Sequence, residues 1–147
     1  MRSMRPEDTI DFPIRKVWNR IARLYNNQAG KYGGTMAIGQ VLLSIDPDGT
    51  PSTKLGPKMG MEARSLTRTL KNMEEEGLIT RVADRSDGRM ARVLLTPKGK
   101  QMRDVSKETV IRFNEAVRAK IPAGQLQTFH SVIDKINTFL DNNELFK

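Results

Sequence analysis

The hydrophobic pattern of this chain changes from a helical to a strand period at Gly77. Before that residue, Leu66, Leu70 and Met73 recur at i, i+4 and i+7, which predicts one buried stripe on a helix over Ala63–Glu76. Glycine readily adopts the left-handed conformation in which many helices end, so Gly77 suits a C-cap. We therefore expect the chain to turn at once from a helix into extended backbone.

Two short runs with β-branched residues follow, over Leu78–Ala83 and Met90–Thr96. Residues 84–89 lie between them, and the Asp87-Gly88 pair in this segment is a common sequence for a hairpin turn. A helix pair followed by a two-stranded hairpin is the pattern of a winged helix.

Amphipathic helices are predicted on both sides of this hairpin unit, because apolar residues recur at steps of three and four. The segments are Pro13–Lys31, Met36–Ile45, Ser52–Met59, Thr96–Ile121 and Gly124–Asn143. Ser52 or Thr53 can cap the third of them. The expected order is α-α-α-α-β-β-α-α. This is a mainly α fold with a small β wing, a winged helix-turn-helix flanked by long N- and C-terminal helices.

The long terminal helices have few neighbours that could cover their apolar faces. A second copy of the chain would supply the same faces, whereas a monomer that packs its own helices is the alternative. We expect one compact domain, with a helical dimerisation region over residues 1–34 and 100–147 and a winged lobe over residues 35–99. Two-fold symmetry would space two lobes for successive major grooves, about 34 Å apart.

The composition excludes several classes of function. The 147 residues include no cysteine, which excludes a disulfide framework, a cysteine zinc site and a thiol redox switch. His130 is the only histidine, so we expect neither a metal site nor a Ser/His/Asp or Cys/His catalytic set. There is no His-Glu-x-x-His, P-loop or Gly-x-Gly-x-x-Gly motif. We predict a non-enzymatic protein without a cofactor.

Two features bear on location. No apolar run approaches the roughly 18 residues that a membrane span needs. The basic N-terminal residues are not followed by the apolar region of a secretory signal. We predict a cytoplasmic protein.

Positive charge is concentrated in the middle of the chain. The net charge is +8, and residues 51–103 hold twelve Lys/Arg against six Asp/Glu, which is +6. Residues 104–147 hold six of each and are neutral. Such a distribution is typical of a nucleic-acid binder, although charge alone fits a merely basic surface equally well.

The predicted helix over Ala63–Glu76 carries much of this charge in its first half. The side chains opposite the buried stripe are Arg64, Ser65, Thr67, Arg68 and Lys71. Its three acids stand at the far end, the reverse of what the helix dipole favours. In the major groove, the first turns of a helix meet base edges, where arginine binds guanine and hydroxyls donate or accept. We predict that this is a DNA recognition helix; an ordinary solvated face is the alternative.

The hairpin tip and the preceding helix add two further candidate contacts. The tip presents Arg85 and Arg89, and a narrow minor groove attracts arginine, which Asp87 could orient through a bidentate pair. A surface salt bridge is the alternative. Ser52 and Thr53 begin a helix whose free backbone N–H groups suit a phosphate.

The sequence resembles the MarR family of bacterial winged helix-turn-helix transcriptional regulators. The segments that carry the resemblance are Gly60–Leu70, Met73–Arg81, Asp84–Arg89 and Val93–Gly99. The family wing typically reads Asp-x-Arg-Asp-x-Arg, followed by Leu-Thr-x-x-Gly. The matching residues are Asp84, Asp87, Arg89, Leu95, Thr96 and Gly99.

Two positions depart from the family pattern. Ser86 stands where the motif has its first arginine, and Arg85 may take that role one place earlier. Gly56-Pro57 lies where the family has helix formers, and an interior proline removes a helical hydrogen bond. We expect the Ser52–Met59 helix to be short, irregular or bent near Leu55.

The resemblance implies a homodimer that binds a pseudo-palindromic double-stranded DNA site, more often as a repressor. It also implies release by a small aromatic or phenolic effector bound between the dimerisation helices and the winged lobe. Candidate pocket residues are Trp18, Tyr25 and Met36, for which plain core packing is the alternative. A second hypothesis is a winged-helix module that binds protein or RNA. The basic, acid-free half-helix and Arg89 favour DNA, because a protein-binding wing would present apolar residues there.

Overall fold

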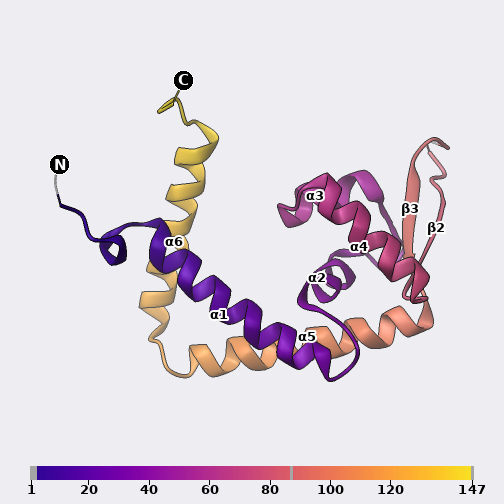
Figure 1. Ribbon diagram of the computed structural model, residues 1–147, viewed down its shortest axis with the longest axis horizontal. Helices are drawn as coiled ribbons and strands as arrows, with labels where there is room; N and C mark the ends of the chain where they lie inside the picture. Colours follow the sequence, from indigo (N-terminus) through magenta and orange to yellow (C-terminus); the bar gives the residue numbers. More distant parts are fainter. Residues whose placement is uncertain (1–2, 87, 147) are drawn as a thin grey trace. The chain divides into compact units, whose positions relative to one another are not determined.

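The computed structural model describes residues 3–86 and 88–146 and shows a mainly helical chain with a small antiparallel sheet (Figure 1). The helices are α1 (Asp11–Gly30), α2 (Met36–Ser44), α3 (Ser52–Met59), α4 (Ala63–Glu75), α5 (Pro97–Arg118) and α6 (Ala123–Asp141), with a short 3-10 turn at Pro6–Asp8. The strands are β1 (Thr50–Pro51), β2 (Ile79–Ala83) and β3 (Ala91–Leu95). Contacts divide the chain into one unit up to Thr109 and a second from Val110, and each is described by itself.

The predicted winged helix-turn-helix is confirmed, with one strand more than expected. β2 and β3 pair from Ile79↔Leu95 to Ala83↔Ala91, and β1 adds to the other edge of β3 through Thr50↔Val93. The order in the sheet is therefore β1-β3-β2. A two-residue strand has no periodicity of its own, and it exists only because the folded chain brings it to β3.

The core of the first unit lies where α2, α3, α4 and the sheet meet. The predicted stripe of α4 is confirmed, since Leu66, Leu70 and Met73 are all buried. The remaining buried apolar residues are Ile38, Val41, Leu42, Ile45, Leu55, Leu78, Ile79 and Val93. The core thus fixes α4 by one face and leaves its opposite face outside.

The start of α5 is held tightly against the end of α4. Thr96 Oγ1 donates to the carbonyl of Gly77 at 2.6 Å and accepts from the backbone N–H of Gly99 at 3.0 Å, which confirms the predicted cap. Gly99 is so close to Leu78 that an added Cβ would lie 2.0 Å from the Leu78 carbonyl oxygen. The first half of α5 also approaches α2, because a Cβ on Gly39 would meet the Ser106 hydroxyl at 3.0 Å.

The apolar face of α1 is largely uncovered in the single chain. Ile14, Val17 and Trp18 are 43%, 53% and 45% exposed. In the second unit, α6 likewise exposes Phe129, Val132, Phe139 and Leu140. These are the faces predicted to pack in a dimer, which remains a prediction, as does the extent of the dimerisation region. No helix within residues 3–86 and 88–146 is both long and apolar enough to cross a membrane.

Candidate nucleic-acid interface

The first turns of α4 expose the predicted basic face. Arg64, Ser65, Thr67, Arg68 and Lys71 are all exposed, on the side of α4 away from the buried stripe. The Thr67 hydroxyl donates to the carbonyl of Ala63 at 2.8 Å, so only its lone pair is left for a base or phosphate. The structure thus places these five side chains together on one accessible helical surface.

The acidic end of α4 is partly engaged with the sheet. Glu74 Oε2 lies 3.7 Å from Arg81 Nε, a residue of β2. This pair draws Glu74 back toward the sheet, whereas Arg64 and Arg68 form no ion pair among the pairs found in the described residues. The electrostatic asymmetry predicted for this helix is therefore retained in the fold.

A left-handed glycine sets the angle between α3 and α4. Gly60 has φ +65°, and the backbone N–H of Met61 donates to the carbonyl of Gly56 at 3.0 Å. Gly56 is buried, and a Cβ there would meet the Met61 carbonyl oxygen at 3.2 Å. The small residue that departs from the family pattern allows this close approach.

Proline at position 57 is accommodated in α3, which is short as expected but runs without interruption from Ser52 to Met59. The lost hydrogen bond falls on the carbonyl of Thr53, in the first turn of a helix of eight residues. The predicted irregularity near Leu55 is not found, because Leu55 is buried in the core and holds the helix in place.

The predicted capping by Ser52 or Thr53 is wrong. The N-cap is Pro51, which forms no side-chain cap because its backbone belongs to β1. The Thr53 hydroxyl instead donates to the sulfur of Met90 at 3.4 Å. Thr53 and Ser52 line a groove of about 540 Å³ between α3 and α4, together with Thr67 and Arg81.

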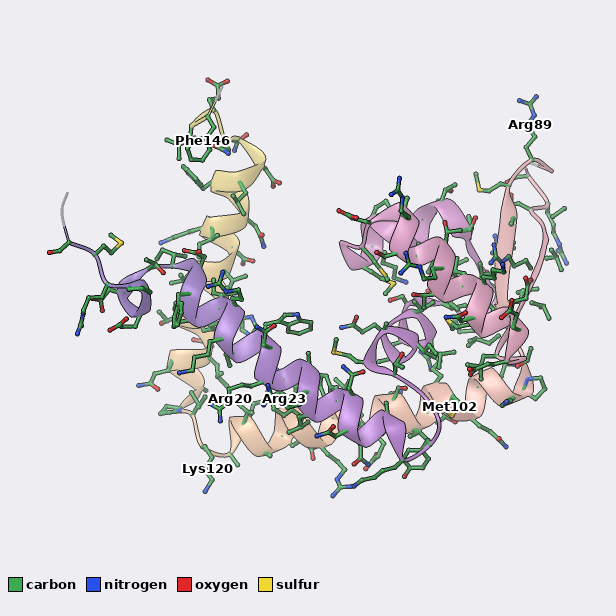
Figure 2. The ribbon with its side chains drawn as sticks, viewed as in Figure 1. Arg20, Arg23, Arg89, Met102, Lys120 and Phe146 are labelled. Atoms are coloured by element: carbon green, nitrogen blue, oxygen red, sulfur yellow. The ribbon has the colours of Figure 1, made fainter. Side chains whose placement is uncertain are left out.

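Arg89 lies at the tip of the β2–β3 hairpin and points away from the helices of the winged lobe (Figure 2). The backbone N–H of Asp84 donates to the carbonyl of Met90 at 2.8 Å and closes the hairpin below the tip. Arg85 is also exposed near this tip. Asp87, predicted to orient an arginine, lies outside the described residues.

The base of the wing contains a buried ion pair that sequence reasoning missed. Arg92 Nη1 donates to Asp84 Oδ1 at 3.0 Å, and the Asp84 side chain is only 5% exposed. Asp84 Oδ2 accepts from both the backbone and the hydroxyl of Ser86. Asp84 was expected only as a motif residue, and the facing of Arg92 on the adjacent strand was the signal that a register prediction could have used.

Trp18, Tyr25 and Met36 lie on neighbouring helices. Burial raises the pKa of the Tyr25 hydroxyl above its ordinary value, and Trp18 is nearly half exposed. Asn26, next to Tyr25, accepts through Oδ1 from the backbone N–H of Met36 at 2.9 Å. The contact joins α1 to the first turn of α2, but these three residues do not line the groove between α3 and α4.

No group of three or more His, Asp or Glu residues suited to a metal ion occurs in the part of the chain that the structure describes. Since the chain has no cysteine, the chemistry at this surface is limited to hydrogen bonding and charge. Arginine, lysine and hydroxyl groups on a convex surface suit a polyanion with readable edges, and duplex DNA is such a ligand.

Residues 42–90 match the model of the MarR family. The chain is 26% identical over 97 residues to the uncharacterized HTH-type transcriptional regulator YdgJ of Bacillus subtilis (strain 168). That match covers 66% of this chain and 59% of YdgJ, so it spans less than two thirds of the relative.

Solved structures share the fold over most of the chain. The MepR–DNA complex of S. aureus superposes with a TM-score of 0.82 at 16% identity, covering 90% of this chain and 98% of MepR. CouR from Rhodococcus jostii RHA1, bound to p-coumaroyl-CoA, superposes with a TM-score of 0.79 at 22% identity, covering 91% and 95%. At these identities the likeness shows a common fold.

Proposed function

This chain belongs to the MarR family of DNA-binding transcription regulators, and we propose that it acts as a cytoplasmic homodimeric repressor of a pseudo-palindromic operator. α4 enters the major groove and the wing reaches the adjacent minor groove. A small aromatic molecule releases the protein from DNA. The proposal gives the chain no enzymatic role, in keeping with a family and fold of transcription regulators.

The observation that carries the proposal is the two-faced character of α4. Leu66, Leu70 and Met73 hold the helix by its inner face, so the opposite basic face is presented without its own packing role. Arg64 and Arg68 lie in its first turns, the part of a recognition helix that meets base edges. MepR, which has this fold, is found in complex with DNA.

The wing and α3 supply the positioning contacts of this proposal. Arg89 at the hairpin tip meets the minor groove, with Arg85 as an alternative donor and Asp87 as the orienting carboxylate. Ser52 and Thr53 lie at the start of α3, where backbone N–H groups meet a phosphate. Such contacts fix register without reading sequence.

The uncovered apolar faces of α1 and α6 support the dimer. Burying apolar surface contributes about 25 cal/mol per Å², so large exposed residues such as Trp18 and Phe129 favour association. A symmetric pair would present two recognition helices to an inverted repeat.

Selection of bound duplexes from a random pool tests the proposal directly. We expect an inverted repeat whose half-site centres are about 34 Å apart, one helical turn. Recovery of single-stranded RNA in a parallel selection, or no enrichment of any duplex, would instead favour the module that binds protein or RNA.

The effector site is proposed between α1 and α2, at Trp18, Tyr25 and Met36. CouR, bound to p-coumaroyl-CoA, shows that a protein of this fold binds an aromatic thioester. Trp18 is the only tryptophan, so its fluorescence reports a ligand there without labelling. Titration with simple phenolic acids should quench it and release the selected duplex together; release without quenching would place the effector elsewhere.

A further inference from the structure

One contact joins the helix-turn-helix to the wing through a sulfur atom. The hydroxyl of Thr53, in the first turn of α3, donates to Met90 Sδ at 3.4 Å. Met90 also accepts through its carbonyl from the backbone N–H of Asp84 at 2.8 Å, and it follows Arg89 directly in the chain. A change at this sulfur therefore acts on the strand that carries the proposed minor-groove arginine.

Methionine is the side chain of this protein most open to two-electron oxidation, because the chain has no cysteine. Met90 is half-buried, so an oxidant can reach it. Met73 is fully buried, and Met59, Met61 and Met102 pack against the core. Met4 is 58% exposed, but it lies in the N-terminal segment, far along the chain from the α3–wing contact.

We propose that Met90 is an oxidation site whose sulfoxide weakens DNA binding. The oxidant is a hydroperoxide or hypochlorous acid. A sulfur lone pair attacks the terminal oxygen of the peroxide, the O–O bond breaks, and the leaving oxygen takes the proton to give water or an alcohol. Sulfur loses two electrons and the peroxide gains them. The inference rests on the proposed function, since its consequence is read at the DNA interface.

The physical consequence follows from the contact itself. The thioether sulfur is a weak acceptor, and oxidation replaces it with a larger, polar sulfoxide. The new oxygen must fit where the Thr53 hydroxyl and the sulfur already touch, so either α3 or the end of the hairpin shifts. A displaced hairpin takes Arg89 away from the groove, and roughly tenfold weaker binding is expected, as for loss of one groove contact.

The test compares wild type with Met90→Leu on the inverted-repeat duplex recovered by selection. Both are treated with limiting hydrogen peroxide, and peptide mass spectrometry locates each sulfoxide. Met90→Leu keeps the volume and the apolar character of the side chain, so it should fold and bind without oxidation. We expect wild type to lose affinity in proportion to oxidation of Met90, and Met90→Leu to keep it although Met4 is oxidised. Treatment with methionine sulfoxide reductases should restore the wild-type affinity.

Two results would overturn the inference. One is a wild type that binds as before with Met90 fully converted, and the other is a Met90→Leu variant that loses affinity to the same extent. Thr53→Val provides a second measure, because removing the hydroxyl relieves the crowding and should reduce the loss on oxidation. If the untreated protein bound no duplex at all, the proposed function would fail, and that outcome is separate from a failure of this site.

Discussion

Arg92 donates to the buried carboxylate of Asp84 across 3.0 Å and, through Nε, to the carbonyl of Asp48 across 3.1 Å. A second guanidinium nitrogen donates to the carbonyl of Gly49 at 3.2 Å. One side chain therefore ties the base of the wing to the turn that precedes β1. Gly49 has φ +92°, and a Cβ there would meet the Leu94 side chain at 2.5 Å, so the turn can approach β3 only as glycine.

Replacement of the buried carboxylate should loosen the wing. Asp84→Ala leaves Arg92 without its partner, and we expect a loss of about 1–3 kcal/mol in the free energy of unfolding measured by urea denaturation. DNA affinity should fall as well. Asp48→Ala is the matched control, because that side chain is 84% exposed, and it should change stability by less than about 0.5 kcal/mol. Equal losses in the two variants would contradict the assigned role of Asp84.

Close packing at the start of α5 makes Gly99 sensitive to a single methyl group. Gly99→Ala forces the α5 backbone away from the Leu78 carbonyl, and we expect a loss of about 1–3 kcal/mol or more in unfolding free energy. Gly124→Ala meets nothing within 4 Å and should be neutral or stabilising by up to about 1 kcal/mol. Thermal melting of both variants checks the difference, and a Gly99→Ala protein as stable as wild type would refute the close approach.

Arg89→Ala should weaken binding to the selected duplex with little change in melting temperature, because the residue lies at an exposed hairpin tip. Arg85→Ala is measured beside it, since either arginine could serve the minor groove. The larger loss identifies the groove residue. Unchanged affinity in both single variants and in the double variant would reject the wing contact.

Arg68→Ala should reduce both affinity and sequence preference. A bidentate contact to a base contributes about 1–3 kcal/mol, and its loss relaxes selection at one position of each half-site. Lys71→Ala, on the same helix, should weaken binding evenly across sequences and reduce the salt slope by about one per site. Competition with single-base operator variants separates the two effects. An Arg68→Ala protein with unaltered preference would exclude a base contact by that residue.

Sedimentation should give roughly twice the chain mass of 16.6 kDa, because α1 and α6 expose apolar faces. Val17→Asp places a charge on the apolar face of α1 and should favour the monomer. Asn19→Asp carries the same charge change on the polar face, the side marked by Arg20 and Arg23 in Figure 2, and should leave the dimer intact. A wild-type monomer at micromolar concentration would remove the dimer from the proposal.

Local patterns in the sequence were enough to predict most elements of the fold. Leu66, Leu70 and Met73 identified α4 and its buried face, and Gly77, with φ +75°, ends it as expected. Thr96 caps α5 as the sequence indicated. These features depend on residues within a few positions of one another, so their physical causes are visible in a short window.

The cap and the strand at residues 50–53 could not be predicted in this way. Ser52 and Thr53 are good capping residues in isolation, but pairing of Pro51 with Arg92 moves the helix start and leaves Thr53 facing Met90. The candidate DNA-binding residues of α4 were found because charge segregates along one helix. The Asp84–Arg92 pair was not, because it depends on strand register.

The sequence by itself determined which segments are helical or extended and which side of α4 is polar, because those properties follow from the order of neighbouring side chains. Only the tertiary structure decided what each polar group meets: that Arg92 joins the wing to the turn at Gly49, that Gly99 must admit the Leu78 carbonyl, and that Thr53 contacts a sulfur. Hydrogen bonds and close packing between residues distant in the chain require a defined three-dimensional arrangement, and no local pattern encodes it.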